Sequence, residues 1–330
     1  MINIFFILNY FLINFLIIYF FKKLSSFFNF YDFPDNIRKF HKKKTSLFGG
    51  SIILLNLLLF YLLSVFLYND LVLNINLKIF ISGCLLFYLL GLIDDKKNLN
   101  STLKFLFELL IAFVIVFYDE SILIEKLYFS SLNKTLDLGN YSIFFTILCF
   151  VIFINALNMF DGINLQSGTY SLIIIFVLFI YSKEYLILIA IVFALLTFLY
   201  LNNKSKVFLG DNGTLLIGFI LSYLIIHSAK STNYINLSAD KIFILMILPG
   251  LELIRLFILR IIKKRHPFSS DRHHIHHILL NNFKYDKVIS IIILLSILPI
   301  LFMFIFSEQL HLIITAFSIF YFIIIKKYEK

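Results

Sequence analysis

Long apolar runs separated by short polar breaks dominate the chain. The first run, INIFFILNYFLINFLIIYFF, contains the ~20 residues that a helix needs to cross ~30 Å of hydrocarbon. It is longer than a signal-peptide core and has no small-residue cleavage site, which favours a retained span. Reading every run in this way predicts about 11 transmembrane helices, which begin near Ile2, Phe48, Leu77, Leu103, Tyr141, Ser171, Tyr185, Gly213, Lys241, Val288 and Leu310.

The fold class expected from this pattern is all-α, as a polytopic integral membrane protein. Hydrophobic residues make up 61% of the chain and charged residues only 15%, which excludes an ordinary soluble domain. The polar breaks reach only ~25 residues, too short for an inserted soluble domain. We therefore expect one domain over residues 1–330.

The distribution of Lys and Arg predicts an orientation with the N-terminus outside and the C-terminus inside. With that topology, only six of the 29 basic residues fall outside: Lys78, Lys126, Lys134, Lys183, Lys230 and Lys241. The other 23 occupy inner loops and the tail, as the positive-inside rule requires. The net charge of +10 is therefore explained by topology, and no nucleic-acid partner is expected.

Four polar segments with chemically versatile side chains fall on the predicted cytoplasmic face. GLIDDKKNLNSTLK follows the third span, NALNMFDGIN the fifth, KVFLGDNG the seventh and DRHHIHH the ninth. Carboxylates at a bilayer boundary are costly to desolvate, so each needs a partner or a chemical role. The shared face favours a single site.

Asp94 and Asp95 end an apolar helix, where adjacent carboxylates repel each other and face the negative end of the helix dipole. A nearby cation would relieve both effects, whereas a solvated helix end is the simpler alternative for a single Asp. Lys104 and Glu108 lie four residues apart, and a helix-surface pair and a substrate role are equally compatible with that spacing.

Asn155, Asn158 and Asp161 recur every three residues and so share one helical face. Amides beside a carboxylate suit a hard cation or a sugar nucleotide, although helix capping by Asn and Gly162 is the alternative. Considered by itself, Asp211 is better explained as a helix-capping residue. Together with the other acids it becomes a candidate Mg²⁺ ligand, because Mg²⁺ takes one or two carboxylates and leaves positions for water and phosphate.

The histidine segment is interpreted as an anion site. On a helix His273, His276 and His277 share a face, and His274 points elsewhere unless the loop bends. A zinc site is disfavoured, because no Cys or Glu nearby would complete a tetrahedral set of ligands. A basic loop that faces the lipid headgroups is the other alternative, but it does not explain ordered histidines. Together with Arg272, the imidazoles suit phosphates, so the site predicts phosphoryl transfer between a soluble and a lipid phosphate. The competing class is a transporter that uses intramembrane carboxylates, which are normally placed near the midplane of related halves.

Five segments in order resemble the polyprenyl-phosphate N-acetylhexosamine-1-phosphate transferases, specifically the WecA-like branch of glycosyltransferase family 4. They are DNIRKFH with GG (Asp35 to His41, Gly49 and Gly50), GLIDDKKNL, NALNMFDGIN, VFLGDNGT and PFSSDRHHIHH. The chain departs from the family pattern in DGINLQ, where Asn164 stands at a position that is often acidic, and at Glu108 and Glu252, which replace a common Gln and a common Asp. These departures put the choice of sugar in doubt.

The resemblance implies transfer of N-acetylhexosamine 1-phosphate from a UDP-sugar to polyprenyl (undecaprenyl) phosphate, with release of UMP. It implies Mg²⁺, or alternatively Mn²⁺, and a cytoplasmic-face site in the bacterial inner membrane at the first membrane step of cell-envelope glycan synthesis, such as O-antigen or teichoic acid. A homodimer is left open. By position, the implied roles are catalytic for Asp94, Asp95 and Asp161, metal-binding for Asp211 and Asn158, and substrate-binding for Lys104, Asn155, Asn164, Arg272, His273, His276 and His277.

Overall fold

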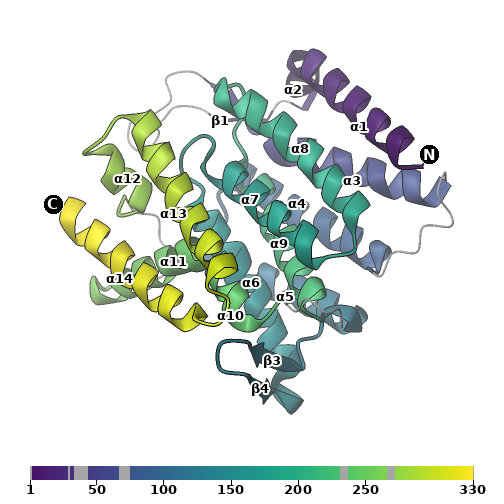
Figure 1. Ribbon diagram of the computed structural model, residues 1–330. Coiled ribbons are helices and arrows are strands. Elements are labelled where there is room, and N and C mark those ends of the chain that lie inside the picture. Colours follow the sequence, from purple (N-terminus) through teal and green to yellow (C-terminus); the bar gives the residue numbers. More distant parts are fainter. Residues whose placement is uncertain are drawn as a thin grey trace.

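The computed structural model describes residues 2–28, 30–32, 44–66, 75–230, 237–265 and 272–329, and most of them are helical (Figure 1). The α-helices are α1 Ile2–Tyr19, α2 Phe21–Phe28, α3 Gly49–Phe66, α4 Leu77–Lys97, α5 Ser101–Tyr118, α6 Ser142–Phe160, α7 Gln166–Tyr181, α8 Tyr185–Asn203, α9 Gly210–Lys230, α10 Ala239–Leu245, α11 Ile247–Ile262, α12 Ile275–Leu280, α13 Tyr285–Ile305 and α14 Leu310–Tyr328.

Among the described residues, eight helices are long and apolar enough to cross a membrane, and up to ten spans result if each of two bent pairs counts as one. The bent pairs are α1 with α2, at 70°, and α10 with α11, at 76°. Each of the 11 predicted segments coincides with one helix or one bent pair. The sixth segment corresponds to α7, which has only 16 residues and is short for a full span. The count of 11 and the orientation stay predictions.

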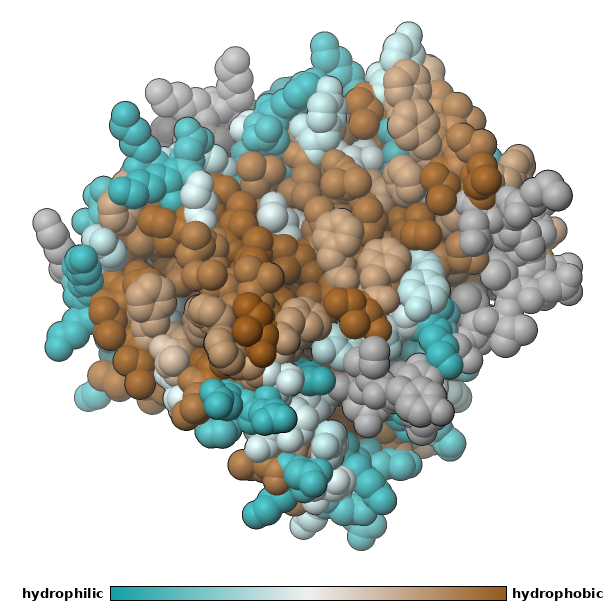
Figure 2. Space-filling view, viewed as in Figure 1, coloured by the Kyte–Doolittle hydropathy of each residue, from teal (hydrophilic) through white to brown (hydrophobic). Residues whose placement is uncertain are grey.

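The outer surface matches a membrane environment. Large apolar side chains are exposed along α1, α5 and α14, including Phe11, Phe117 and Ile323. Figure 2 shows a broad hydrophobic band across the molecule, with hydrophilic residues gathered above and below it. A surface of this kind is stable in hydrocarbon and would aggregate in water. We therefore describe the chain as a multi-pass membrane protein.

Helix α9 forms the centre of the bundle. Its side chains are buried from Asn212 to Ser228, and it packs against α4, α6 and α3. The ring of Phe219 stacks against those of Phe80, Phe87 and Phe150, which come from α4 and α6. Because both its ends are held by these neighbours, the first turn of α9 is fixed relative to the ends of α4 and α6.

A small polar cluster connects α1, α3 and α8 inside the bundle. The Asn14 amide donates to Asn56 Oδ1 (2.8 Å), and the Thr197 hydroxyl donates to Asn14 Oδ1 (2.8 Å). Tyr10 donates its hydroxyl to the backbone carbonyl of Asn56 at 3.1 Å. In hydrocarbon such interhelical hydrogen bonds favour one arrangement of the helices.

The prediction of an all-α fold is incomplete, because two short antiparallel hairpins are present. Strands β1 (Tyr31–Asp32) and β2 (Thr45–Ser46) pair at one end, and β3 (Lys126–Phe129) and β4 (Lys134–Asp137) pair at the other (Figure 1). The second hairpin turns at Asn133, whose φ of 47° suits an Asn. Strands this short give little signal beside spans of ~20 apolar residues.

Candidate functional site

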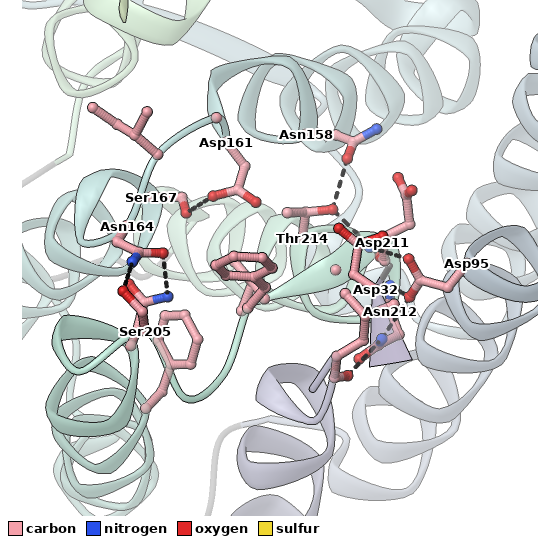
Figure 3. Close-up of a pocket in the computed structure, with 18 of the residues that line it drawn as sticks. Asp32, Asp95, Asn158, Asp161, Asn164, Ser167, Ser205, Asp211, Asn212 and Thr214 are labelled. Carbon is pink, nitrogen blue, oxygen red and sulfur yellow. Dashed lines mark hydrogen bonds between the residues drawn. The ribbon is translucent and has the colours of Figure 1, made fainter. Parts of the chain in front are cut away.

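A cavity of about 1310 Å³ opens at the end of the bundle that carries β1, opposite the β3–β4 hairpin (Figure 1). Its walls come from β1, the C-terminal ends of α4 and α6, the loop before α9, α12 and the start of α13. Figure 3 shows Asp161 and Ser167 on one side of this cavity and Asp95, Asp211 and Asn212 on the other. Segments more than 250 residues apart in the chain thus share one concave surface.

Lys104 bridges two acids at the edge of the cavity. Its Nζ lies 2.7 Å from Asp94 Oδ2 and 2.6 Å from Asp211 Oδ1. Asp94 is 8% exposed and also accepts the backbone N–H of Leu99 at 2.8 Å, so it lies behind the cavity wall. The Asp211 side chain is 35% exposed and lines the cavity. Lys104 on α5 therefore joins the end of α4 to the start of α9.

Asp95 holds the first turn of α9. Its Oδ1 accepts the backbone N–H of Asp211 at 2.9 Å, and its Oδ2 accepts that of Asn212 at 3.0 Å. A carboxylate is favoured there because the helix start has unsatisfied N–H groups and a positive dipole end. The close approach requires Gly91 on α4, because a Cβ there would lie 2.3 Å from the Asp211 carbonyl oxygen. The sequence places these two acids side by side, and the structure gives them different partners.

Asn158 connects α6 to the same acids. Its amide lies 2.7 Å from the Thr214 hydroxyl, and its neighbours are best satisfied when its nitrogen donates to Thr214 and to Asp211 Oδ1 (3.0 Å). The Asn158 oxygen then accepts from Lys104 Nζ at 3.1 Å. A metal-ligand role for Asn158 would require the amide to turn its oxygen toward the cavity.

Asp161 lies at the C-cap of α6 and lines the cavity. Burial raises the pKa of its carboxyl to about 6, and the negative charges of Asp211 and Asp95 act in the same direction. A hydrogen bond from the Ser167 hydroxyl opposes this shift. An acid whose pKa is raised beside other acids in a cleft is typical of a functional site.

Neutral amides and hydroxyls line the part of the cavity beyond Asp161. Asn164 donates to Ser205 Oγ at 3.0 Å and accepts from the Asn202 amide at 3.1 Å. Tyr285 donates its hydroxyl to the Asn164 carbonyl at 2.8 Å, and the Phe208 ring also lines this region. Polar groups without charge beside an aromatic ring suit a sugar or a nucleobase.

Three histidines of the DRHHIHH segment line the cavity: His274, His276 and His277. His274 is the N-cap of α12 in an extended conformation, and its ring stacks on that of His276 at 5.3 Å between centroids. The His276 ring covers Gly162, where a Cβ would lie 2.0 Å from His276 Cε1. Burial lowers the pKa of His276 well below its usual value, and the neighbouring His274 and His277 lower it further. His276 is therefore neutral at pH 7.

Some predicted site residues lie away from the cavity. His273 faces Lys263 (2.9 Å from its Nε2) and Glu329 (3.3 Å from its Nδ1), and Arg272 is exposed. Asn155 is buried and donates to the Glu108 carboxylate inside the bundle. The prediction that His273, His276 and His277 share a helical face is wrong, because α12 begins only at Ile275. The chain bends before this helix, and His274 lines the cavity in place of His273. The predicted segment Asp35 to His41 lies outside the described residues.

The cavity contains residues that sequence reasoning did not single out: Asn202, Ser205, Tyr285, Ser167, Asn212 and Thr214. Thr214 and Asn212 follow Asp211 in the GDNGT motif, so their position beside an acid was a usable signal. Ser205 and Asn202 precede the same motif, but common polar residues in a short loop carry little information by themselves. Tyr285 follows the histidine segment, and the apolar run that begins just after it gave no reason to assign it to a site.

The donor set fits Mg²⁺ shared with a substrate and does not fit a closed metal centre. Within the described part of the chain, no three acids, histidines or cysteines are grouped as a metal site. Asp211 is partly exposed to the cavity, with Asn158 beside it and with Asp95 and Asp161 adding negative charge. Mg²⁺ commonly takes one or two carboxylates and completes its coordination with water and phosphate oxygens. These residues therefore suit a cation whose remaining ligands come from a phosphate ester.

Comparisons with known proteins agree with the motifs. The family model described as Glycosyl transferase family 4 matches residues 77–229, from α4 to α9, which include every predicted acidic site residue. The chain is similar to undecaprenyl-phosphate alpha-N-acetylglucosaminyl 1-phosphate transferase of Salmonella typhi, with 27% identity over 74% of this chain and 68% of that protein. The protein of the same name from Escherichia coli strain K12 is 26% identical over 83% of this chain and 75% of its own length.

A relative from Bacillus subtilis strain 168 has a similar name, probable undecaprenyl-phosphate N-acetylglucosaminyl 1-phosphate transferase. It is 28% identical over 76% of this chain and 69% of its own length. The matches to all three relatives cover more of the chain than the family model does. Residues 77–229 are thus similar to glycosyl transferase family 4, in agreement with the superfamily that the motifs resemble.

Proposed function

We propose that this protein transfers N-acetylhexosamine 1-phosphate from a UDP-sugar to polyprenyl phosphate, with undecaprenyl phosphate as the lipid. In this reaction an oxygen of the lipid phosphate forms a bond to the phosphorus that bears the sugar. The P–O bond to UMP breaks, and UMP leaves with the bonding electrons. The names of the relatives support this reaction and favour N-acetylglucosamine as the first sugar to test.

The observation that carries the proposal is the distribution of charge around the cavity. Asp95, Asp161 and Asp211 line it, Lys104 bridges Asp211 to Asp94 behind the wall, and histidines face these acids. Phosphoryl transfer depends mainly on positioning and on neutralising phosphate charge. A cavity that pairs cation-attracting acids with phosphate-binding donors, at the end of an apolar bundle, suits one soluble and one lipid-linked phosphate.

Different parts of the cavity suit the two substrates. The amides of Asn164 and Asn202 and the Phe208 ring would recognise the neutral part of the nucleotide sugar. His274, His276 and His277 would donate to its diphosphate. Asp94 and Asp95 stand at the C-terminal end of α4 beside the cavity, where a lipid phosphate would approach. A Mg²⁺ ion held by Asp211, with Asn158 turned toward it, would neutralise the diphosphate; Mn²⁺ is the alternative.

The deciding experiment is a release assay with purified protein, undecaprenyl phosphate and Mg²⁺. A panel of UDP-N-acetylhexosamines is offered, and UMP and the lipid-linked sugar are measured together. We expect equimolar products with at least one sugar and none in EDTA. If no sugar yields UMP while the protein moves a solute across liposomes, the transferase proposal is replaced by the transporter alternative.

The proposed location is the inner membrane of a bacterium, with the cavity on the cytoplasmic side. Ser205 at the rim of the cavity and Leu132 in the β3–β4 hairpin are both exposed, at opposite ends of the molecule. Single cysteines at these positions, in a background without Cys84 and Cys149, can be labelled in intact cells. We expect an impermeant reagent to label L132C alone, and labelling of S205C alone would reverse the topology.

A further inference from the structure

A buried charged cluster lies next to the histidine segment but outside the cavity wall. It consists of Glu252 and Arg255 on α11 and Tyr321 on α14, which are 1%, 7% and 2% exposed. The Arg255 guanidinium donates through Nη2 to both Glu252 oxygens at 3.1 Å and through Nε to the Tyr321 hydroxyl at 2.8 Å. The Tyr321 hydroxyl in turn donates to Glu252 Oε2. None of the three lines the cavity.

This cluster holds the backbone at the start of α12. Glu252 Oε1 accepts the backbone N–H of Ile275 at 2.8 Å, and Arg255 Nη2 donates to the carbonyl of His273 at 2.5 Å. The Nδ1 of His274 lies 3.5 Å from the same Glu252 oxygen. Three consecutive residues of the histidine segment are thus fixed by two side chains of α11.

The local sequence gives α12 little stability of its own. The helix has six residues, and its N-cap His274 makes no side-chain capping hydrogen bond, so Glu252 takes over that role from another helix. A buried ion pair is often no more stabilising than apolar residues of the same volume. Its geometry, with each charged group also bonded to the backbone of one segment, indicates a role in fixing that segment.

We infer that Glu252, Arg255 and Tyr321 are positioning residues, which hold residues 273–275 so that His274, His276 and His277 face the cavity. The catalytic consequence rests on the proposed function. Without the cluster, α12 would have no fixed entry point. Its histidines would lose the register that places His276 over Gly162 and His274 beside it. Groups that bind phosphates must be held to within a fraction of an ångström to be effective.

The first arm of the test uses Glu252→Gln, with Asp240→Asn as the matched control. Asp240 is 4% exposed and accepts the backbone N–H of Ser131 at 2.8 Å, so it also fixes a backbone segment, but at the opposite end of the molecule. Hydrogen–deuterium exchange is followed peptide by peptide. We expect E252Q to accelerate exchange at 272–282 by about tenfold without affecting 126–137, and D240N to do the reverse. Unchanged exchange at 272–282 in E252Q would overturn the inference.

The second arm asks whether Glu252 acts through His274. We expect E252Q to lower UMP release about 30-fold and H274A about 100-fold. Because both changes remove the same function, UMP release by the double variant should stay within about twofold of that by H274A. The effects of D240N and H274A on UMP release should instead multiply. If the losses of UMP release in E252Q and H274A multiply in the double variant, Glu252 serves general stability and the positioning role is wrong.

Tyr321→Phe is the variant used if E252Q fails to fold. It retains the Glu252–Arg255 pair and removes one hydroxyl. We therefore expect a smaller acceleration of exchange at 272–282 and a loss of UMP release of about threefold. In the H274A background, Y321F should cause no further loss of UMP release. Failure of the proposed function is recognised separately. In that case wild-type protein releases no UMP with any sugar, and the exchange arm alone decides whether the cluster positions α12.

Discussion

Buried acids occur at both ends of the helix bundle, and their surroundings differ. At the β3–β4 end, Asp240 accepts the backbone N–H groups of Ser131 and Lys241 and the hydroxyls of two serines. Asp119 at the same end accepts the backbone N–H of Ser121 at 3.1 Å and the hydroxyl of Tyr223. Each of these carboxylates connects a loop to a helix. Their contacts explain their burial without a ligand.

At the cavity end the acids are grouped. Burial and then the charges of Asp211 and Asp95 raise the pKa of Asp161, and Lys104 bridges Asp94 and Asp211. A group of neighbouring carboxylates with a single bridging ammonium remains negative overall and attracts a further cation. The comparison separates buried acids that are saturated by hydrogen bonds from grouped acids that still repel each other, and we propose that only the grouped acids serve binding and catalysis.

Exchanging one acid at each end for its amide gives the largest expected contrast. Asp211→Asn removes a candidate cation ligand and half of the Lys104 bridge, so UMP release should fall by about 10³-fold or more. Asp240→Asn alters only a structural contact and should change UMP release by less than threefold while lowering the melting temperature. Equal losses of activity in the two variants would contradict the distinction between the two ends.

Removing the bridging ammonium sharpens the same comparison. Lys104→Gln should lower UMP release about 100-fold, because Asp94 and Asp211 lose the group that holds α4 and α9 together. The acids become more negative without it, so the Mg²⁺ concentration that gives half-maximal residual activity should fall several-fold. A matched change at the other end is Lys230→Gln, whose ammonium donates to the Glu120 carbonyl at 2.6 Å. That variant should keep the wild-type Mg²⁺ requirement.

Steric displacement of the histidine segment should have a smaller effect. In Gly162→Ala the new Cβ would lie 2.0 Å from His276 Cε1, so the His276 ring must move, and we expect UMP release to fall about 10- to 50-fold. Gly250→Ala is the control, because a Cβ there meets nothing within 4 Å and Ala favours the α11 helix. Wild-type UMP release by G162A would mean that the packing of His276 over Gly162 is not needed for the reaction.

The apolar spans and the grouping of motifs at one face were accessible from sequence, because hydrophobic runs and positional spacing are local signals. Each predicted segment coincides with a helix or a bent pair. The different partners of Asp94 and Asp95 were not accessible, because they depend on the distance of α9 and α5 from the end of α4. The place of His274 depends on where α12 begins, and that is set by Glu252, 23 residues away.

The smallest expected effect concerns stability and pH at Asp161. Its folded-state pKa of about 6 exceeds the ordinary value of 3.8, so the folded protein binds this proton more tightly than the unfolded chain. The contribution of Asp161 to the free energy of unfolding should therefore be fully present below about pH 4 and be lost as the pH rises through 6, by no more than about 3 kcal/mol. Asp161→Asn cannot ionise, and its amide oxygen can still accept from Ser167. In EDTA and detergent, D161N should melt a few degrees above wild type at pH 7.5, and the two should converge below about pH 4. Parallel melting curves over this range would show that the Asp161 carboxylate is not strained by its neighbours, and the cavity acids would then resemble Asp119 and Asp240 at the far end.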